Sequence, residues 1–234
     1  MNKYNINDST SYCLGMSLTI EALKHKSEYL EEVILSEKAY KNEQLSLLKS
    51  LCEKHNIEYI YDDKTIDKLS IKDNCYAIGV FKKYDSKLQS DNHIVLYGFN
   101  NFGELGTIIR SAISFNQKAI VLINSDIDYF DPACIRASMG SIFLCNIVKY
   151  KDLDTYLRKY PNNNLYPFVS KGKTELKDIS FYSPYSLIIS QGYYDLDNKF
   201  SDDYYINHLN DNEISLSIRS SIILDRLYQS NLKR

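Results

Sequence analysis

The sequence of 234 residues has little of what marks disordered or membrane-spanning proteins. It contains only eight glycines and four prolines, while 44% of its residues are hydrophobic and 25% are charged. This composition is typical of an ordinary soluble globular chain. No apolar run reaches the roughly 18 residues that a membrane span requires. The polar start, residues 1–11, also lacks the basic and apolar regions of a signal peptide, so we expect a cytoplasmic protein with no membrane contact.

The sequence also lacks the spacing of a metal site or a catalytic triad. Its five cysteines are widely spaced without a C-x-x-C pair, and its four histidines are scattered. We therefore expect buried, reduced thiols and no metal. The net charge of −2 argues against a protein that coats nucleic acid nonspecifically, but it allows a local basic patch that selects one folded RNA.

Helices and strands are predicted to alternate in two runs, separated by the polar residues 82–92, which read as a linker. The first run has expected helices near 18–23, 45–51 and 65–69, and strands at 33–35, 57–61 and 75–81. The second has expected strands at 94–97, 119–123, 165–169 and 186–190, and helices after Gly103, around 131–138 and over 212–228. This order predicts an α/β fold with a mostly parallel sheet, whose ligands bind at the carboxyl ends of the strands.

The first segment that could carry chemistry is NFGELGTIIRSA, residues 101–112, directly after a predicted strand. Gly103 and Gly106 are expected to let the backbone turn into a helix whose free amides favour an anion, with Arg110 about one turn along it. A phosphate or an oxyanion fits there. A glycine-containing loop with a surface arginine explains the segment as well.

The second segment is DPACIRASMGSIF, residues 131–143. Asp131 fits a helix cap, Pro132 fits the first turn, and Gly140 fits the end. Arg136 and Ser138 would then lie near the end of the helix. A purely structural helix end explains this pattern equally well.

The third segment, INHLNDNEISLSIRSSIIL, covers residues 206–224 and leads into the last predicted helix, with Asn212 as its expected cap. The apolar positions of that helix occupy more than one face. They are Ile214, Leu216, Ile218, Ile222, Ile223 and Leu227. A helix with two apolar faces must bury both of them. The second face would be buried in a subunit interface or within the single chain.

Taken in order, the three segments resemble the motifs of the SpoU (TrmH-like) RNA 2′-O-ribose methyltransferases, a branch of the knotted SPOUT superfamily. The family's first motif reads roughly N-P-G-N-L-G-T-I-I-R-T-A, and residues 101–112 follow it without a gap. RASMGSIF, residues 136–143, resembles the family's R-A-S-x-G-x-x-F. SYCLGMSLTIEALKHK, near the start, is similar to the family's small N-terminal domain.

The resemblance implies a homodimeric methyltransferase that uses S-adenosylmethionine to modify a ribose 2′-hydroxyl of tRNA or rRNA. Residues 1–88 would form an α/β RNA substrate-binding domain, and residues 89–234 a trefoil-knotted methyltransferase domain. The catalytic residues carried over are Arg110, Glu104 and Ser217. The cofactor-binding residues are Ile189, Ser190, Gln191, Gly192, Ile206, Ile214 and Ser215. The RNA-binding residues are Arg110, Arg136 and Ser138.

The second and third motifs depart from the family pattern. The family's L-V-F-G-N-E-G-x-G-L is LIISQGYYDL here, so Ser190 and Asp195 replace glycines and threaten the backbone path around the cofactor. Glu104 replaces an asparagine with an acceptor-only anion, expected in a loop from which it can fold back on Arg110. The alternative is therefore a degenerate knotted paralogue that binds RNA or an adenosine-type ligand without methyl transfer.

Overall fold

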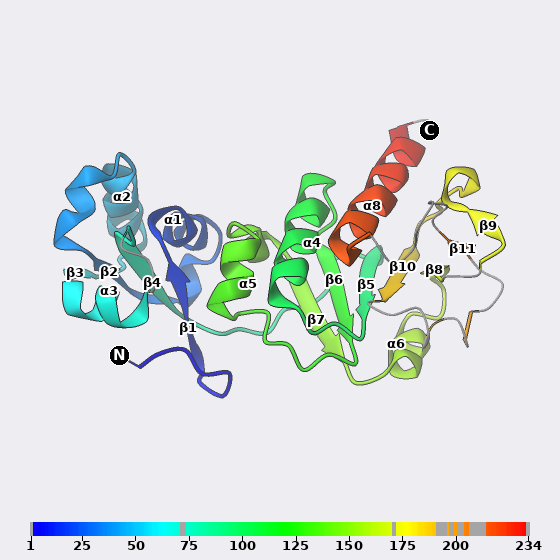
Figure 1. The fold of residues 1–234 in the computed structure, drawn as a ribbon, viewed down its shortest axis with the longest axis horizontal. Helices are drawn as coiled ribbons and strands as arrows, with labels where there is room; N and C mark the ends of the chain where they lie inside the picture. Colours follow the sequence, from blue (N-terminus) through cyan, green and yellow to red (C-terminus); the bar gives the residue numbers. More distant parts are fainter. Residues whose placement is uncertain are drawn as a thin grey trace. The chain divides into compact units, whose positions relative to one another are not determined.

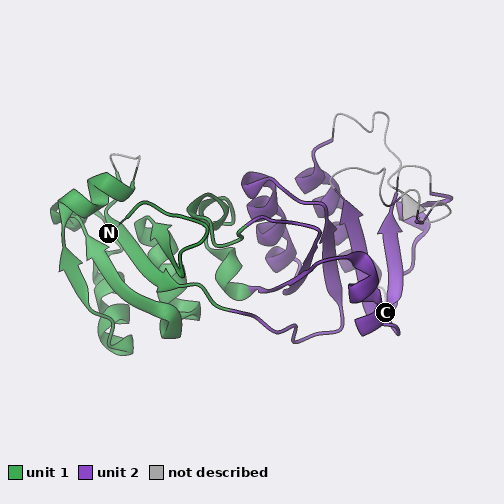
Figure 2. Ribbon diagram, turned by 90° about the horizontal axis from the view of Figure 1, so that it is seen from below, with its two compact units in different colours: residues 1–84, 128–144 green, residues 85–127, 145–234 purple. Residues whose placement is uncertain are grey.

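The computed structural model describes residues 2–70, 74–169, 172–190, 196, 199–200, 204–205 and 214–232. The chain divides into two compact units (Figure 2). Unit 1 comprises residues 1–84 and 128–144, and unit 2 comprises residues 85–127 and 145–234. The chain therefore first leaves unit 1 within the predicted linker, and a later segment returns to it. The predicted domains, 1–88 and 89–234, stay a prediction.

Unit 1 is built around a mixed sheet of four strands in the order β1-β4-β2-β3. The strands are β1 (Thr10–Leu14), β2 (Leu30–Leu35), β3 (Tyr59–Tyr61) and β4 (Ala77–Lys82). The helices are α1 (Met16–His25), α2 (Leu45–His55), α3 (Asp63–Leu69) and α5 (Pro132–Ala137), with short 3₁₀ turns at η1 (Ser27–Tyr29), η2 (Glu37–Lys41) and η3 (Ser141–Leu144). β4 pairs antiparallel with both β1 and β2, while β2 and β3 are parallel.

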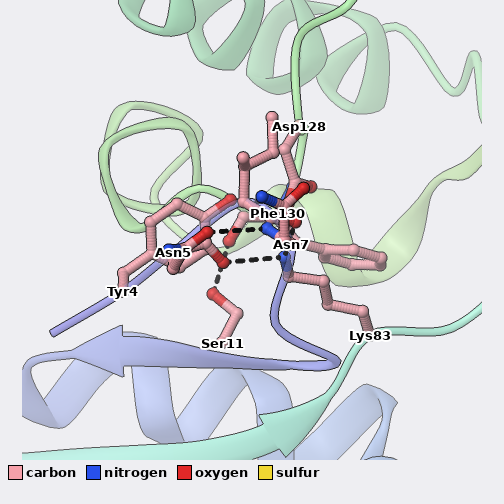
Figure 3. Close-up of polar contacts among 8 residues, drawn as sticks. Tyr4, Asn5, Asn7, Ser11, Lys83, Asp128 and Phe130 are labelled. Atoms are coloured by element: carbon pink, nitrogen blue, oxygen red, sulfur yellow. Dashed lines mark hydrogen bonds and ion pairs between the residues drawn. The ribbon is translucent and has the colours of Figure 1, made fainter. Parts of the chain in front are cut away.

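A polar cluster ties the returning segment 128–130 to the rest of unit 1 (Figure 3). Lys83 Nζ lies 2.6 Å from Asp128 Oδ2 and donates to the carbonyl of Ile6 at 2.9 Å. The hydroxyl of Tyr4 also donates to Asp128 Oδ2, at 2.5 Å, and burial, assisted by this hydrogen bond, raises the pKa of Tyr4. Ser11 Oγ donates to the carbonyl of Phe130 at 2.5 Å. Because both charges are largely buried, this ion pair is screened less than a surface pair.

Unit 2 contains a sheet of seven described strands in the order β7-β6-β5-β10-β8-β11-β9 (Figure 1). The strands are β5 (His93–Tyr97), β6 (Ala119–Ile123), β7 (Asn146–Tyr150), β8 (Asn164–Phe168), β9 (Thr174–Glu175), β10 (Tyr185–Ser190) and β11 (Tyr204–Tyr205). The helices are α4 (Phe102–Ser114), α6 (Leu153–Lys159) and α8 (Leu216–Leu232), with a 3₁₀ turn at η4 (Leu176–Asp178). Each neighbouring pair in this sheet is parallel. The predicted α/β fold with a mostly parallel sheet is confirmed.

Strands β6 and β10 are buried along their whole length, as expected for a parallel sheet covered on its faces. One described core cluster packs the α6 residues Leu153 and Tyr156 against Val95, Val121 and Ile188. All five cysteines of the chain are buried and form no disulfide, in agreement with the sequence. Within the described residues, no helix has both the length and the apolar character of a membrane span.

The sequence patterns located most elements but missed several. β1, β7 and α6 were not expected, and α4 begins at Phe102 rather than after Gly103. Asp131 caps α5 as predicted, because its Oδ1 accepts the amide of Ala133 at 2.7 Å. Asn212, the expected cap of the last helix, lies outside the described residues.

Candidate active site

The candidate site begins at the carboxyl ends of two neighbouring parallel strands. Ile189 pairs with Leu96 and Ser190 pairs with Tyr97, so the last residues of β10 and β5 lie at the same edge of the sheet. Ile189 and Ser190 are both buried. Open parallel sheets bind their ligands at this edge. Two residues predicted to contact the cofactor are therefore placed where a ligand is expected.

Helix α4 leads away from this edge and presents Arg110. Asn101 caps the helix, since its Oδ1 accepts the amide of Glu104 at 3.0 Å. The buried side of α4 comprises Leu105, Gly106, Ile108, Ile109 and Ala112. Arg110 is exposed, as are Thr107 and Ser114, which lie three and four residues away on the same face. The guanidinium is thus presented to solvent on a polar stripe of the helix.

The structure corrects the expected position of Glu104. It does not lie in a preceding loop but in the first turn of α4, because the cap at Asn101 starts the helix earlier than the glycines suggest. Six residues on a helix separate Glu104 from Arg110 by about 120° around the axis. Among the described residues, no ion pair joins the two. A carboxylate in the first turn instead interacts favourably with the positive end of the helix dipole.

The start of α8 carries the serines of the third motif. Ser215 Oγ accepts the amide of Ile218 at 3.4 Å, which caps the helix, and it lies 3.0 Å from Ser217 Oγ. Ser215 is exposed and Ser217 is half-buried. The hydroxyl of Ser221 donates to the carbonyl of Ser217 at 2.8 Å.

Helices α4 and α8 lie side by side (Figure 1). Ser111 Oγ lies 3.0 Å from Ser221 Oγ, and the rings of Phe115 and Tyr228 are 5.9 Å apart. The later residue, Phe115 at the end of α4, contacts the later residue of α8, Tyr228, so the two helices run in the same direction. The first turn of α8, with Ser215 and Ser217, therefore faces the half of α4 that begins at the carboxyl edge of the sheet.

The sequence reasoning did not identify Ser111 and Ser221 as the contact that aligns the two helices. The one sequence feature that could have indicated this contact is the small polar residue that each of the two motifs carries at that position. Arg219, in the same helix α8, is only 7% exposed. Three predicted cofactor residues, Gln191, Gly192 and Ile206, lie outside the described residues, while Ile214 is half-buried just before α8.

The other two predicted RNA-binding residues belong to unit 1. Arg136 is exposed at the end of α5. Ser138 is buried, and its hydroxyl donates to the carbonyl of Ile135 at 2.9 Å, so it stabilises the end of α5. Its role in RNA binding stays a prediction, and its burial argues against a direct contact. Among the described residues, no group of histidine, cysteine or carboxylate side chains has the arrangement of a metal site.

Several solved structures share this fold. An rRNA methyltransferase from Sinorhizobium meliloti is 19% identical, with a TM-score of 0.76 over 94% of this chain and 87% of that chain. The SpoU methyltransferase AviRb from Streptomyces viridochromogenes, in complex with the cofactor AdoMet, is 15% identical, with a TM-score of 0.80 over 96% of this chain and 91% of that chain. An RNA 2′-O ribose methyltransferase is 14% identical, with a TM-score of 0.74 over 96% and 90% of the two chains. At these identities the likeness shows the fold.

The sequence comparisons address the family itself. No curated protein sequence matches the chain. Residues 91–191 match the model of the SpoU rRNA Methylase family, a range that contains the strand ends, α4 and α5. The resemblance seen in the motifs is thereby confirmed over residues 91–191, the part of this chain that is similar to the SpoU rRNA Methylase family.

Proposed function

We propose that this protein transfers a methyl group from S-adenosylmethionine to a ribose 2′-hydroxyl of tRNA or rRNA. The observation that carries the proposal is the exposed Arg110 on α4, a helix that follows the carboxyl edge of a parallel sheet and packs against α8, within the range that matches the SpoU family model. Structures with the same fold include an AdoMet complex and an RNA 2′-O ribose methyltransferase. Substrate RNA would place the enzyme in the cytoplasm.

The predicted cofactor-binding residues that the structure describes have side chains suited to binding S-adenosylmethionine. Ile189 and Ile214 offer apolar surface, and Ser190 and Ser215 offer neutral hydroxyl groups. Such groups suit a ligand that combines an adenosine with a charged tail, because they bind its polar edges without a competing charge. Ser190, at a glycine position of the family, is accommodated at the buried end of β10 in regular strand geometry. When bound, S-adenosylmethionine supplies a methyl group activated by the positive sulfur.

Arg110 is proposed to stabilise negative charge during the transfer. Its guanidinium stays protonated at any ordinary pH, so its role is to bind the developing alkoxide or the neighbouring phosphate rather than to remove the proton. Its exposure on α4 leaves it accessible to RNA. Ser217 is proposed to help orient the ribose, since its hydroxyl lies in the first turn of α8 beside Ser215.

The remaining features complete the proposal. We assign a trefoil knot to the C-terminal part of the methyltransferase domain, an RNA-binding role to residues 1–88, and a homodimer to the assembly. The exposed side chains of Ile218, Ile222 and Tyr228 on α8 support a subunit contact. The paralogue without methyl transfer is not favoured, because the SpoU family model matches across the first motif and into the second.

Arg110→Ala tests the proposal directly. If Arg110 stabilises charge that is present only in the transition state, its removal should lower kcat by about 10²-fold. The affinity for S-adenosylmethionine, measured by calorimetry, should not change. The assay follows tritium transfer from the labelled cofactor to RNA from a strain that lacks this gene. Arg158→Ala is the matched control, because Arg158 is an exposed helical arginine on α6.

Glu104→Asn restores the family residue and probes the neighbouring carboxylate. Loss of a negative charge near RNA phosphate should lower KM for RNA.

Equal tritium incorporation by wild type and Arg110→Ala would remove Arg110 from the mechanism. If wild type shows no incorporation while a related methyltransferase labels its own RNA, the proposed activity is wrong.

A further inference from the structure

Unit 1 contains a cavity that the methyl-transfer site does not use. Its volume is about 350 Å³, within the range of small-ligand pockets. It is formed where the end of β1 and the start of α1 meet residues 69–70 and 74–76 and the end of α5. The residues that the structure places around it are Leu14, Gly15, Met16, Ser17, Leu18, Asn42, Leu69, Ser70, Asn74, Cys75, Tyr76, Arg136 and Met139.

The charge of this lining points to an anionic ligand. Among the described residues that line it, Arg136 is the one side chain charged at neutral pH, and none is a carboxylate. Arg136 is exposed, so its guanidinium remains available to a ligand at the mouth. Guanidinium groups bind carboxylates and phosphates in bidentate geometry, so a phosphate group fits at this position.

The remaining walls suit a nucleobase. Tyr76 is half-buried and contributes an aromatic ring, and the side chains of Leu69 and Met139 add apolar surface. Asn42 and Asn74 contribute amide groups, which donate and accept hydrogen bonds as a base edge requires. Single-stranded RNA is recognised by this combination of stacking, amide contacts to base edges and cationic contacts to phosphate.

The turn at Met139 and Gly140, which follows Arg136 and the end of α5, packs closely against α1. Gly140 has a φ of +79°, and a Cβ at this position would lie 2.9 Å from the Cβ of Glu21 on α1. Met139 also has a positive φ, of 52°, yet its side chain is 53% exposed. The close packing at Gly140 therefore holds the backbone next to Arg136 and Met139, two residues of the cavity lining, against α1.

We propose that this cavity binds one unpaired nucleotide of the substrate RNA, distinct from the nucleotide that is methylated, with its base against Tyr76 and its phosphate on Arg136. This assignment rests on the proposed action on RNA. It adds a recognition site in unit 1 that is separate from the groups of α4 and α8. Such a site would help select the RNA without taking part in the chemistry.

The test measures RNA binding in the absence of S-adenosylmethionine. The probe is a fluorescein-labelled single-stranded RNA of eight mixed nucleotides, followed by anisotropy with the full chain. Arg136→Gln and Tyr76→Ala should each weaken binding about tenfold, in the range expected for one phosphate contact or one stacked base. Tyr76→Phe should bind like wild type, because the ring is kept. Arg136→Gln should also reduce the salt dependence of binding by about one ion.

Two controls keep the result specific. Tyr40→Ala and Arg158→Gln change exposed residues outside the cavity and should leave affinity unchanged. Thermal unfolding of each variant checks that the fold is intact. Cross-linking of RNA that contains 4-thiouridine should label a peptide with Tyr76 or Met139.

The outcomes separate this site from the proposed function. Equal affinities of wild type, Arg136→Gln and Tyr76→Ala would overturn the cavity site, whether or not the enzyme transfers methyl groups. Competition by free AMP at the concentration at which the RNA itself binds would overturn the assignment to RNA. Weakened RNA binding by both variants would support the site even if wild type fails to transfer a methyl group.

Discussion

His93 occupies the first position of β5 and is fully buried, in a chain of hydrogen bonds that crosses the core of unit 2. Its Nε2 lies 2.7 Å from the carbonyl of Ser90, and its Nδ1 lies 2.8 Å from the hydroxyl of Tyr156. Tyr156 in turn contacts Ser186 Oγ at 2.6 Å, and Asn163 donates to Ser186 at 3.0 Å. Because a carbonyl only accepts, neutral His93 carries its proton on Nε2 and accepts from Tyr156.

This arrangement predicts a pH dependence of stability. Burial lowers the pKa of His93 from its usual 6.5, although the bond to Ser90 and the charge of Asp91 oppose the shift. The unfolded chain then takes up the proton first. The contribution of His93 to the free energy of unfolding should be greatest above pH 6.5. It should decrease as the pH falls through the lowered pKa of the folded protein. Urea denaturation between pH 5 and 8 measures it.

His93→Gln should flatten this dependence and lower stability at pH 7 by about 1–3 kcal/mol, because Tyr156 and Ser90 lose their partner. His25→Gln is the control, since His25 is a partly exposed residue of α1. A wild-type profile without a decline below pH 6.5, or an unchanged decline in His93→Gln, would contradict the role assigned to His93.

At the scale of elements, the packing of the end of α5 against α1 within unit 1 depends on the turn at Gly140. Gly140→Ala would introduce both an unfavourable positive φ and a short contact with Glu21. We expect a loss of about 2 kcal/mol in the free energy of unfolding, since the backbone strain alone costs roughly 1–2 kcal/mol. Gly103→Ala is the control: it lies in α4 with room for a methyl group, so it should be neutral or slightly stabilising. Equal stability of Gly140→Ala and wild type would show that the turn can rearrange to accommodate the methyl group without a cost in free energy.

At the scale of the whole molecule, the predicted homodimer requires that exposed apolar residues of α8 are buried in the subunit interface. Ile218 and Ile222 lie one turn apart and are 53% and 39% exposed, which is unusual for paired isoleucines on a helix. Replacing both by glutamate should shift the protein to a 27.2 kDa monomer, because charges in an interface core are costly to desolvate. Sedimentation at micromolar concentration provides the measurement. Gln229→Glu, on an exposed position of the same helix, should leave the dimer intact. A wild-type protein that sediments only as a monomer would exclude the dimer.

The sequence by itself determined features that depend on local chemistry. The apolar runs at 94–97, 119–123 and 186–190 form the buried parallel strands, since only a covered sheet buries such runs. Asp131 followed by Pro132 predicted the start of α5, because both act on the nearest amides. The first motif likewise identified the family, since its residues are contiguous. β1 and α6 were missed because both segments are short, although Leu153, Tyr156 and Leu157 of α6 have helical spacing.

Tertiary structure decided which distant residues meet. The start of α4 depended on the side chain of Asn101 rather than on the glycines, so Glu104 lies in the helix and away from Arg110. No pattern in the sequence places Ser111 against Ser221, since 110 residues separate them and the contact forms only when two helices pack. The same holds for Arg136: its segment packs in unit 1, where it meets Tyr76 around a cavity. Packing joins such residues because burial of apolar surface, and not sequence neighbourhood, selects the contacts of a fold.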